Sequence, residues 1–511
     1  MALPAQSTRT KPVLKASALR SDGIVFGVVF ALSLTIIQRL LGFARGILFC
    51  HLMTDQQLGQ FSLIYSWLLT LAPLAVLGMP GTFGRFLEEF RQQGSLGSFL
   101  IIISRVSIVT TLMMAAAMLL FPHEFSWQIL GSGNRVDLMW ATAAALILLT
   151  GYNYLVSLVE ALRQIRLATI MRFVSGTGFT IVGVAALWFA HPDASTLIAV
   201  AAFGASSMLG ALPAIWYLKR FRHELQDQAP PVTSRQVFMR IGPYAAWWWM
   251  SNLLQNMYEL ADRYMLVHWT NQETVVNVQA VVGQYHSGRV IPMMLAGLAE
   301  MVRGLILPYL TAAWLRGDVA YVRQQMNWAI KLLALGLVVS GSGLLVASHW
   351  LFDALLQGRY ADGLAVMPLT MVYCIWISIA IVGQDYLWIR EKGHWANAVF
   401  AIGLVINVAL NAWLIPTYGL WGAVGATALS NAIVLAGLFG LNAWFGCRLS
   451  TACVWAACLP FVLLLPPMAA MVATVILLLV AATTTVYFTA DELKELRQLT
   501  QSAWSRITGT R

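Results

Sequence analysis

Residues 420–444 read LWGAVGATALSNAIVLAGLFGLNAW and contain no charged side chain. A helix of this length, rising about 1.5 Å per residue, spans the roughly 30 Å hydrocarbon core of a bilayer. Comparable apolar stretches recur along the 511-residue chain, of which 59% is hydrophobic and 11% charged. So few charges cannot cover a water-facing surface, and the sequence therefore predicts that lipid is the solvent for most residues.

The apolar stretches predict helices rather than strands of a barrel, because they are unbroken and do not alternate with polar residues. We therefore expect an all-α polytopic membrane protein with about fourteen transmembrane helices. The expected spans are residues 23–43, 60–79, 98–121, 138–160, 168–190, 195–218, 238–262, 281–311, 327–350, 364–387, 395–415, 420–444, 451–465 and 467–488. Only Pro466-Pro467 separates the last two, so a single re-entrant hairpin is the alternative there.

The distribution of basic residues predicts the orientation. The chain has 32 Lys and Arg against 22 Asp and Glu, a net charge of +10. With a cytoplasmic N-terminus, the outer connections hold only Arg45, Arg135, Arg263 and Arg359, and most other Lys and Arg fall on the cytoplasmic side. This positive-inside bias predicts a multi-pass protein of the cell inner membrane, surrounded by membrane lipids. It accounts for the basic excess without a nucleic-acid partner.

The spans divide into two halves with a faint internal repeat. Phe43-Ala44-Arg45 and Gly59-Gln60-Phe61 in the first half correspond to Ala261-Asp262-Arg263 and Gly283-Gln284-Tyr285 in the second. Two six-helix lobes in the same orientation imply a pseudo-two-fold axis along the membrane normal. The expected divisions are a basic cytoplasmic N-terminus (1–22), an N-terminal lobe (23–218), a cytoplasmic linker (219–237), a C-terminal lobe (238–445), an extra transmembrane hairpin (451–488) and a cytoplasmic amphipathic tail (489–511).

Arginines within the spans are candidates for binding an anionic headgroup, because a charge at the bilayer centre costs about 2.5–3.5 kcal/mol unless a partner or water compensates it. Arg39 lies deep in the first span and Arg45 near its outer end, about 120° apart around the helix. Arg289 and Arg303 share one side of the eighth span with Glu300. Snorkelling to the headgroups and an internal Glu300–Arg303 pair are the structural alternatives.

Acidic residues within or at the ends of the spans are candidates for coupling transport to H+ or Na+. Glu259 and Asp262 lie at the outer end of the seventh span, Glu300 within the eighth, and Asp385 near the inner end of the tenth. A surface ion pair between Glu259 and Arg263, four residues apart, is the alternative for the first of these.

Motifs of several enzyme classes are missing from the sequence. It has no GxxxxGK[ST] phosphate loop, and no HExxH or GxSxG motif. The five cysteines include no CxxC pair and are expected to be buried apolar residues. We therefore predict no catalytic residue, no metal site and no cofactor, and a protein that is not an enzyme. Trp247-Trp248-Trp249 is typical of an interfacial aromatic belt.

Three groups of residues resemble the oligosaccharide-exporting flippases of the MOP superfamily, which include O-antigen and lipid II flippases. The first is Arg39-Leu40-Leu41-Gly42-Phe43-Ala44-Arg45 with Leu58-Gly59-Gln60-Phe61-Ser62 and Leu77-Gly78. The second is Ala261-Asp262-Arg263 with Val282-Gly283-Gln284-Tyr285 and Leu307-Pro308. The third is Asn407, Asn411, Leu414-Ile415-Pro416, Gly419, Gly422-Ala423 and Ala426-Thr427. The resemblance extends from about residue 24 to 445.

The resemblance implies two six-helix lobes in a V around a cationic cavity, with alternating access. The cargo it implies is a lipid-linked glycan, with glycan-assembly machinery as a candidate partner. Gly46 stands where the lipid II flippases have an acid after the R-x-L-G-F-x-R run. Ser287-Gly288 likewise replaces the acid of their Y-x-D-R pattern between Tyr285 and Arg289. These departures favour a lipid-linked glycan other than a peptidoglycan precursor.

The predicted function is export of a polyprenyl-pyrophosphate-linked oligosaccharide, with Arg39, Arg45, Arg289 and Arg303 holding the pyrophosphate. One alternative is a cation-coupled multidrug exporter of the same superfamily, which would want acids in the first lobe; its first span has none between Gly23 and Arg45. A membrane-embedded glycan ligase is disfavoured by the short outer loops. A membrane subunit of a polysaccharide synthase complex stays open.

Overall fold

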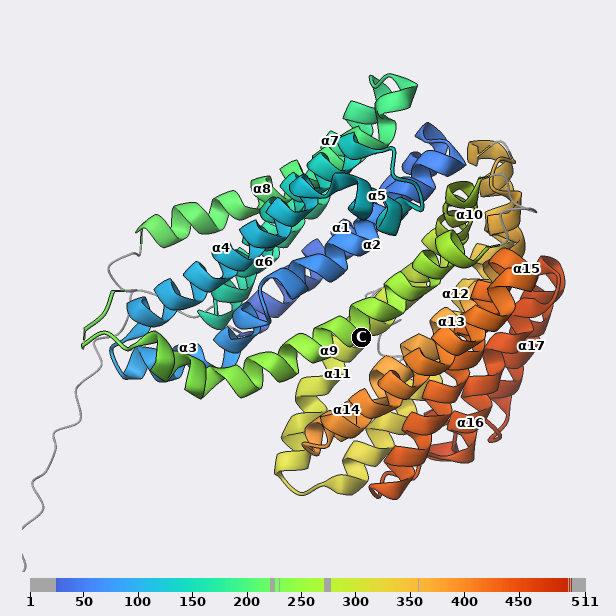
Figure 1. Cartoon of the computed structure of the whole chain (residues 1–511). Helices are drawn as coiled ribbons and strands as arrows, with labels where there is room; N and C mark the ends of the chain where they lie inside the picture. The colour runs from blue at the N-terminus through green and yellow to red at the C-terminus, as the bar shows by residue number, and fades with distance from the viewer. Residues whose placement is uncertain are drawn as a thin grey trace, which may run out of the picture.

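The computed structural model describes residues 24–220, 226–228, 230–270, 277–356, 358–494, 496 and 498. Every regular element within these ranges is a helix, as predicted. The expected N-terminal segment 1–22, much of the linker 219–237 and most of the amphipathic tail lie outside the described residues. Figure 1 shows two groups of helices, coloured blue to green and green to red, with α9 along the boundary between them.

The first bundle comprises the helices before the linker. It holds α1 (Ile24–Leu52), α2 (Asp55–Ala75), η1 (Met79–Thr82), α3 (Phe83–Gln92), α4 (Leu96–Leu120), α5 (Pro122–Leu130), α6 (Val136–Ala161), α7 (Ile165–Trp188), η2 (Pro192–Ala194) and α8 (Ser195–Arg220). The short helices α3 and α5 were not predicted. With Arg85, Glu88, Glu89 and Arg91, α3 is a charged amphipathic helix rather than an apolar span.

The second bundle comprises the helices after the linker. It holds α9 (Ser234–Trp269), α10 (Val278–Val290), α11 (Pro292–Leu315), α12 (Val319–Leu356), α13 (Ala361–Gly383), α14 (Asp385–Ile389), α15 (Gly393–Trp444), α16 (Thr451–Cys458), η4 (Leu459–Leu464) and α17 (Pro467–Thr483). The last two expected spans are separate helices divided at Leu465-Pro466.

Two helix breaks fall where the sequence carries Pro or Gly. The expected eighth span is divided into α10 and α11, with Pro292 as the first residue of α11, where its missing N–H costs no helical hydrogen bond. Within α15, Gly419 has φ 52° and ψ −122°, so that α15 is two helices joined at a kink. The expected spans 395–415 and 420–444 lie on the two sides of this kink.

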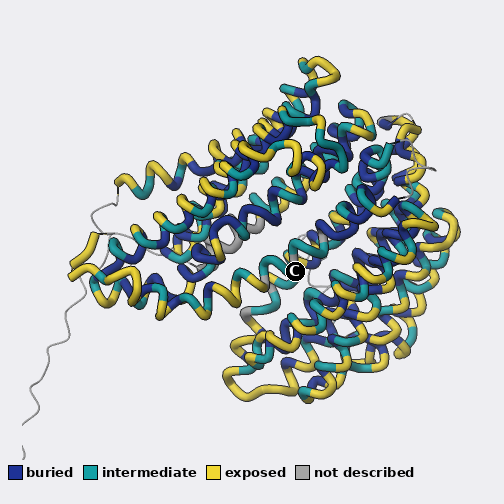
Figure 2. Tube along the Cα trace, viewed as in Figure 1, coloured by how far each residue is buried: buried dark blue, intermediate teal, exposed yellow. Residues whose placement is uncertain are grey.

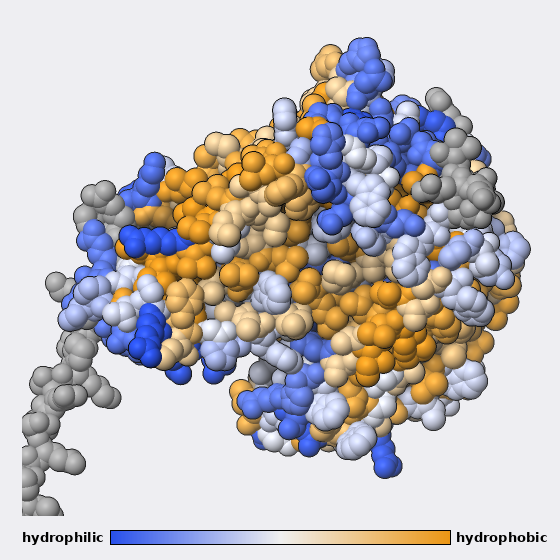
Figure 3. Space-filling view, viewed as in Figure 1, coloured by the Kyte–Doolittle hydropathy of each residue, from blue (hydrophilic) through white to orange (hydrophobic). Residues whose placement is uncertain are grey.

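The outer surface of the molecule is broadly apolar. Side chains such as Phe189, Leu315 and Trp444 are more than 80% exposed. Figure 2 shows exposed residues along the outward sides of the helices, and Figure 3 shows hydrophobic residues over both bundles with hydrophilic ones gathered toward the ends. Among the described residues, ten helices are long and apolar enough to cross a membrane. An apolar surface this extensive requires lipid.

The helix α9 connects the two bundles. Its N-terminal half packs Val237 and Ile241 against Phe86 and Phe90 of α3. Arg240 also donates hydrogen bonds of 2.9 and 3.0 Å to the Glu89 carboxylate, which holds the pKa of Glu89 below its usual range. Farther along, α9 packs against α2 and α15. One continuous helix therefore contributes to the first bundle at one end and to the second at the other.

The bundles meet most closely where α2 crosses α10. A Cβ added at Gly59 would lie 1.8 Å from the carbonyl oxygen of Gln279, and one added at Gly283 would lie 1.9 Å from that of Asp55. Gly59 therefore faces the carbonyl of Gln279, four residues before Gly283. Gly283 likewise faces the carbonyl of Asp55, four residues before Gly59. This reciprocal contact relates the two copies of the Gly-Gln-aromatic repeat and leaves no room for a side chain at either glycine.

The start of the C-terminal tail is held by a buried ion pair. Lys331 of α12 and Glu492 have side chains only 3% and 9% exposed, with Nζ 2.5 Å from the carboxylate. The Tyr487 hydroxyl donates to the Lys331 carbonyl oxygen at 2.8 Å. Leu493 and Leu496 pack against the core, so the beginning of the expected surface helix is anchored to the bundle. Four of the five cysteines are buried as predicted, whereas Cys458 is exposed.

Candidate functional site

A buried carboxylate lies where three helices of the second bundle meet. Asp262 of α9 is 2% exposed. One of its oxygens accepts hydrogen bonds of 2.6 Å from the hydroxyls of Tyr285 in α10 and Thr427 in α15. Its other oxygen accepts one of 2.8 Å from the Asn411 amide. Asn407 accepts from Asn411 at 3.1 Å and donates to Thr427 at 3.2 Å. We call these five residues the Asp262 cluster.

The kink in α15 assembles this cluster. Asn407 and Asn411 precede Gly419, whereas Thr427 follows it. An unbroken helix would hold Asn411 and Thr427 about 24 Å apart along its axis. The chain instead folds back so closely that a Cβ at Gly422 would lie 2.3 Å from the carbonyl oxygen of Leu414. Both halves of α15 then present polar side chains to the same carboxylate. These amides and hydroxyls sit in otherwise apolar helices, and their hydrogen bonds offset the cost of burial.

Two arginines lie beside the Asp262 cluster. Arg263 is 7% exposed and donates through Nε to the hydroxyl of Ser62, across the boundary in α2, at 3.0 Å. Arg289 is 6% exposed and donates to the Tyr285 hydroxyl at 3.4 Å. The two guanidinium groups lie 5.9 and 5.1 Å from the centre of the Tyr285 ring. Nδ1 of His286 lies 3.0 Å from the same Ser62 hydroxyl.

We call Arg263 and Arg289 the arginine pair, and the pair together with the Asp262 cluster the junction site. Two guanidinium groups and one carboxylate stand close together in it. Charges buried this deeply need partners, and these include the Ser62 hydroxyl for Arg263 and the Tyr285 hydroxyl for Arg289. Guanidinium groups bind phosphate oxygens through paired N–H donors and stay charged at any physiological pH. The arrangement is therefore suited to an anion that reaches the boundary between the bundles.

A second charged group lies on α11 and α14. Arg303 donates through Nε to Asp385 at 2.7 Å, and Glu300 lies 3.9 Å from the same guanidinium. The Asp385 side chain is 2% exposed, whereas that of Glu300 is 47% exposed. Three of the predicted site residues are therefore brought together here. The expected stripe on one helix does not include Arg289, because the break at Pro292 separates Arg289 from this group.

The arginines of α1 point to different helices. The side chain of Arg39 is exposed and lies over Gly297 of α11, where an added Cβ would be 2.7 Å from its Nη1. Gly297 is one turn before Glu300, so Arg39 reaches the second bundle near the Arg303 group. Arg45 instead stacks on Phe179 of α7, with 4.2 Å between its guanidinium carbon and the ring centre. The Glu259 side chain lies outside the described residues.

The sequence reasoning did not include Arg263, Asn407, Asn411 or Thr427 among the site residues. Arg263 was assigned to an outer connection, but α9 continues to Trp269 and places it inside the helix. Asn407 and Asn411 are one helical turn apart in an apolar stretch, a spacing that puts both amides on one face. That spacing was the available signal. Among the described residues, no group of three or more His, Cys, Asp and Glu could hold a metal ion.

Comparisons with known proteins agree with this fold. The family described as "Polysaccharide biosynthesis protein" matches residues 24–314. The uncharacterized membrane protein YabM of Bacillus subtilis (strain 168) is 24% identical over 268 residues, which are 50% of this chain and 48% of YabM. The match thus spans about half of that relative's length.

Two kinds of solved transporter share the architecture. The lipid II flippase MurJ, in an inward closed conformation, superposes with a TM-score of 0.61 at 14% identity, covering 88% of this chain and 97% of MurJ. An inward-facing multidrug resistance MATE transporter of the MOP superfamily also gives 0.61, at 15% identity, covering 85% of this chain and 98% of that one. At these identities the likeness concerns the fold alone.

Proposed function

Because the chain belongs to the polysaccharide biosynthesis protein family and is a multi-pass membrane protein of the MOP superfamily, we propose that it is a flippase. Its cargo would be a polyprenyl-pyrophosphate-linked oligosaccharide, or a related polysaccharide precursor, exported across the cell inner membrane. The family description supports a role in polysaccharide synthesis, and one structural neighbour is itself a lipid flippase. Both kinds of neighbour are transporters rather than enzymes.

The observation that carries the proposal is the arginine pair at the boundary between the bundles. Arg263 and Arg289 are both buried beside the Tyr285 ring, and Arg263 already bonds across the boundary to Ser62. When the bundles separate, this bond breaks and the guanidinium groups become available to a pyrophosphate. The anion then replaces Ser62 as the partner of Arg263, so opening the boundary and binding the substrate offset one another.

Arg39 and the Arg303 group supply an earlier contact for the same anion. Arg39 is exposed and reaches from α1 to α11, and Arg303 is shared between Asp385 and the half-exposed Glu300. An incoming pyrophosphate competes with these carboxylates for Arg303. The lipid tail stays in the bilayer while the anion moves from this group to the junction site. Rocking of the two bundles then exposes the glycan on the other side.

The Asp262 cluster is the candidate coupling site in this proposal. It gathers a carboxylate, two amides and two hydroxyls, which are oxygen ligands suited to Na+. Among the described residues, Oδ1 of the fully buried Asn411 has no hydrogen-bond partner, so one acceptor is left over. Binding of Na+ or H+ at Asp262 weakens its attraction for the neighbouring arginines. Ion binding at Asp262 and pyrophosphate binding at the arginine pair are thereby linked, because each changes the local charge at the other's binding site.

Glycan export by a strain deleted for this gene tests the proposal. Cells complemented with Arg289→Ala should export less than about 1% of the wild-type level, because loss of a buried phosphate-binding guanidinium costs several kcal/mol. Lipid-linked glycan should accumulate on the cytoplasmic face. Arg240→Ala, which removes an exposed arginine at the end of α9 that packs against the first bundle, is the matched control and should export normally. Full export by a well-expressed Arg289→Ala protein would contradict the proposal.

The drug-exporter alternative has a specific observation in its favour, since the MATE transporter superposes as well as MurJ does. A drug exporter would give deletion cells that accumulate a cationic dye yet export glycan normally. A synthase subunit would leave lipid-linked glycan unchanged on both membrane faces while its polymerisation fails. The same deletion strain therefore distinguishes all three functions.

A further inference from the structure

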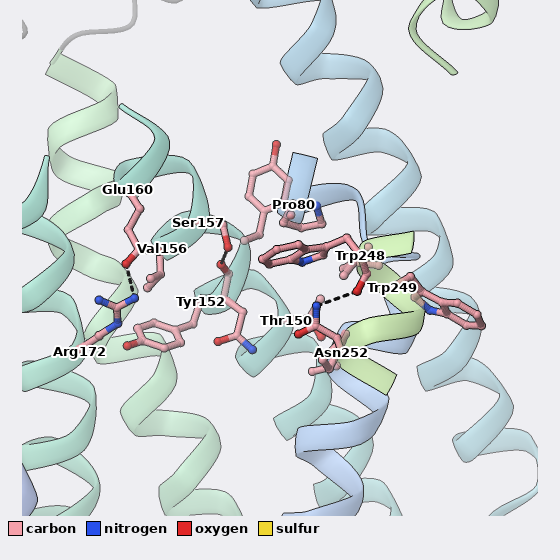
Figure 4. Close-up of a pocket in the computed structure, with 17 residues that line it drawn as sticks. Pro80, Thr150, Tyr152, Val156, Ser157, Glu160, Arg172, Trp248, Trp249 and Asn252 are labelled. Atoms are coloured by element: carbon pink, nitrogen blue, oxygen red, sulfur yellow. Dashed lines mark hydrogen bonds and ion pairs between the residues drawn. The ribbon is translucent and has the colours of Figure 1, made fainter. Parts of the chain in front are cut away.

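A cavity apart from the junction site lies between helices of the first bundle and α9. It has a volume of about 320 Å³ and opens where the end of α2 and η1 face α6, α7 and α9. Figure 4 shows its wall, which includes Pro80, Thr150, Tyr152, Ser157, Trp248 and Asn252. This volume is at the lower end of the range of about 300–1,000 Å³ for sites that bind small molecules. We call it the α6–α9 pocket.

One wall of the α6–α9 pocket is aromatic. The Trp248 ring lies against η1, where a Cβ added at Gly81 would be 2.0 Å from the ring carbon Cδ1. Glycine at this position therefore lets the indole lie flat beside Pro80, as Figure 4 shows. Tyr244, one turn before, lies nearly parallel to it at 6.4 Å. The neighbouring Trp247 is 53% exposed and does not line the pocket, whereas Trp248, which is 44% exposed, does.

The other wall carries neutral hydrogen-bonding groups. Thr150 is 5% exposed, and among the described residues its hydroxyl has no hydrogen-bond partner. A buried hydroxyl without a partner costs about 1–3 kcal/mol, which a ligand hydroxyl would recover. The Asn252 amide donates to the Trp248 carbonyl at 2.9 Å, and Ser157 donates to that of Asn153 at 2.9 Å. Both side chains keep oxygen lone pairs that can accept from a ligand.

The charges of the pocket cancel. Glu160 and Arg172 form an ion pair with each other at its edge, and Figure 4 shows Tyr152 between this pair and the rest of the wall. A pocket with one aromatic face, several neutral hydrogen-bonding groups and no net charge fits a sugar ring, which has apolar C–H faces and a rim of hydroxyls. We propose that the α6–α9 pocket binds a sugar of the lipid-linked substrate. This inference rests on the proposed flippase function and names the part of the substrate that sets specificity.

The pocket is placed to act together with Arg39. Gly176 follows Arg172 by one turn of α7, and a Cβ added there would lie 2.7 Å from Nε2 of Gln38, the residue before Arg39. The pocket edge at Arg172 is thus about one helical turn, roughly 6 Å along α7, from the point where α7 meets Gln38, and Arg39 is the next residue of α1. The first sugar of such a substrate is bonded directly to the pyrophosphate. One molecule can therefore place a sugar in the pocket and its anion near Arg39.

On the topology that the Lys and Arg distribution predicts, this pocket is in the cytoplasmic half of the first bundle. It precedes the junction site along the export path. A sugar held there is recognised before the pyrophosphate reaches Arg289. The pocket then selects which glycan enters, whereas the arginines bind the anion common to all lipid-linked glycans.

Photo-crosslinking in cells tests occupancy directly. The variant Ser157→p-benzoylphenylalanine places the crosslinker in the pocket, and the same change at Trp247 places it outside as the matched control. Mass spectrometry of the irradiated protein should find the cell's own lipid-linked glycan on the first variant and not on the second. The adduct should disappear in cells that lack the first glycosyltransferase of the glycan. An adduct with phospholipid only, or none, would overturn the inference.

Export by Trp248→Ala gives the second readout, with Trp247→Ala as control. Loss of the aromatic face should lower export about tenfold when lipid-linked glycan is limiting, and raising the glycan supply should restore it. Trp247→Ala should export at the wild-type rate. Normal export by Trp248→Ala, with export abolished in Arg289→Ala, would remove the sugar site and leave the flippase standing. Normal export by both Trp248→Ala and Arg289→Ala would contradict the proposed flippase function itself.

Discussion

The two copies of the internal repeat give their arginines different surroundings. In the first bundle, Ala44 precedes Arg45, whose guanidinium stacks on Phe179, and Phe61 packs 6.1 Å from the same ring. In the second bundle, Asp262 precedes Arg263, and Tyr285 at the position of Phe61 donates its hydroxyl to Asp262. Replacing Ala by Asp and Phe by Tyr turns an apolar site into a polar network. In the coupling role that we propose, the second copy supplies the carboxylate of Asp262, and the first copy has Ala44 at that position.

The glycines are the same in both copies, because each bundle must approach the other's backbone. Gly59 and Gly283 make reciprocal contacts with the carbonyls of Gln279 and Asp55. The glycine contact that closes this end of the boundary is therefore symmetric. The side chains beside it differ, with Ala44 and Phe61 in the first copy and Asp262 and Tyr285 in the second. The fold therefore combines a closing contact that both copies share with a buried carboxylate network in the second copy, and each feature can be broken separately.

Removing the charge of the second copy should have the largest effect. In Asp262→Asn, only one oxygen remains to accept hydrogen bonds. If it accepts from the Tyr285 and Thr427 hydroxyls, the new NH2 group points at the NH2 group of Asn411, so that two donors face each other. We expect no detectable export and a destabilisation of about 1–3 kcal/mol. Export assays measure the loss of transport, and thermal unfolding of the purified protein measures the loss of stability. An Asp262→Asn protein that exports normally under every ion condition would show that the acid has no role in coupling.

Breaking the shared contact should have the next largest effect. In Gly283→Ala, the added Cβ meets the Asp55 carbonyl, so the boundary cannot close at this end and export should fall at least about tenfold. Gly304→Ala is the matched control, since nothing lies within 4 Å of a Cβ there. Export by both variants, with equal amounts in the membrane, provides the measurement. Equal export would mean that closure does not depend on the glycine crossing.

Making the second copy more like the first should have the smallest effect. Tyr285→Phe removes one of three hydrogen bonds to Asp262 and one partner of Arg289, and leaves the charges in place. Export should fall a few-fold, and its dependence on Na+ or pH should shift, because Asp262 loses one hydrogen bond but keeps its charge and the other two. The exposed Tyr418→Phe serves as control. A change in export without any shift in ion dependence would limit Tyr285 to packing.

Much of the fold follows from local sequence. The apolar stretches predict the long helices. Pro292 and Gly419 stand at two helix breaks, since proline fits the first turn of a helix and glycine readily adopts the positive φ of the kink. The short helix α3 escaped prediction because its apolar residues face the bundle at a spacing that a charged surface loop could also show. The helix α1 extends beyond the expected end at residue 43, since the apolar residues up to Leu52 continue it.

Less of the candidate site could be predicted. Arg289 and Asp262 were recognised as costly charges in an apolar chain, but their partners come from helices up to 165 residues away. The pairing of Arg303 with Asp385 depends on how α11 packs against α14, which no local pattern contains. The α6–α9 pocket depends on Gly81 facing Trp248, a contact between residues far apart in the sequence.

The most direct test of the flippase is translocation by the purified protein. Lipid-linked glycan extracted from deletion cells is reconstituted with the protein in vesicles, and a membrane-impermeant glycosidase reports the fraction on the outer face. Wild-type protein should make the whole pool accessible over time, whereas Arg289→Ala vesicles should stay at the fraction initially outside. Wild-type vesicles that match protein-free vesicles would contradict the proposed function.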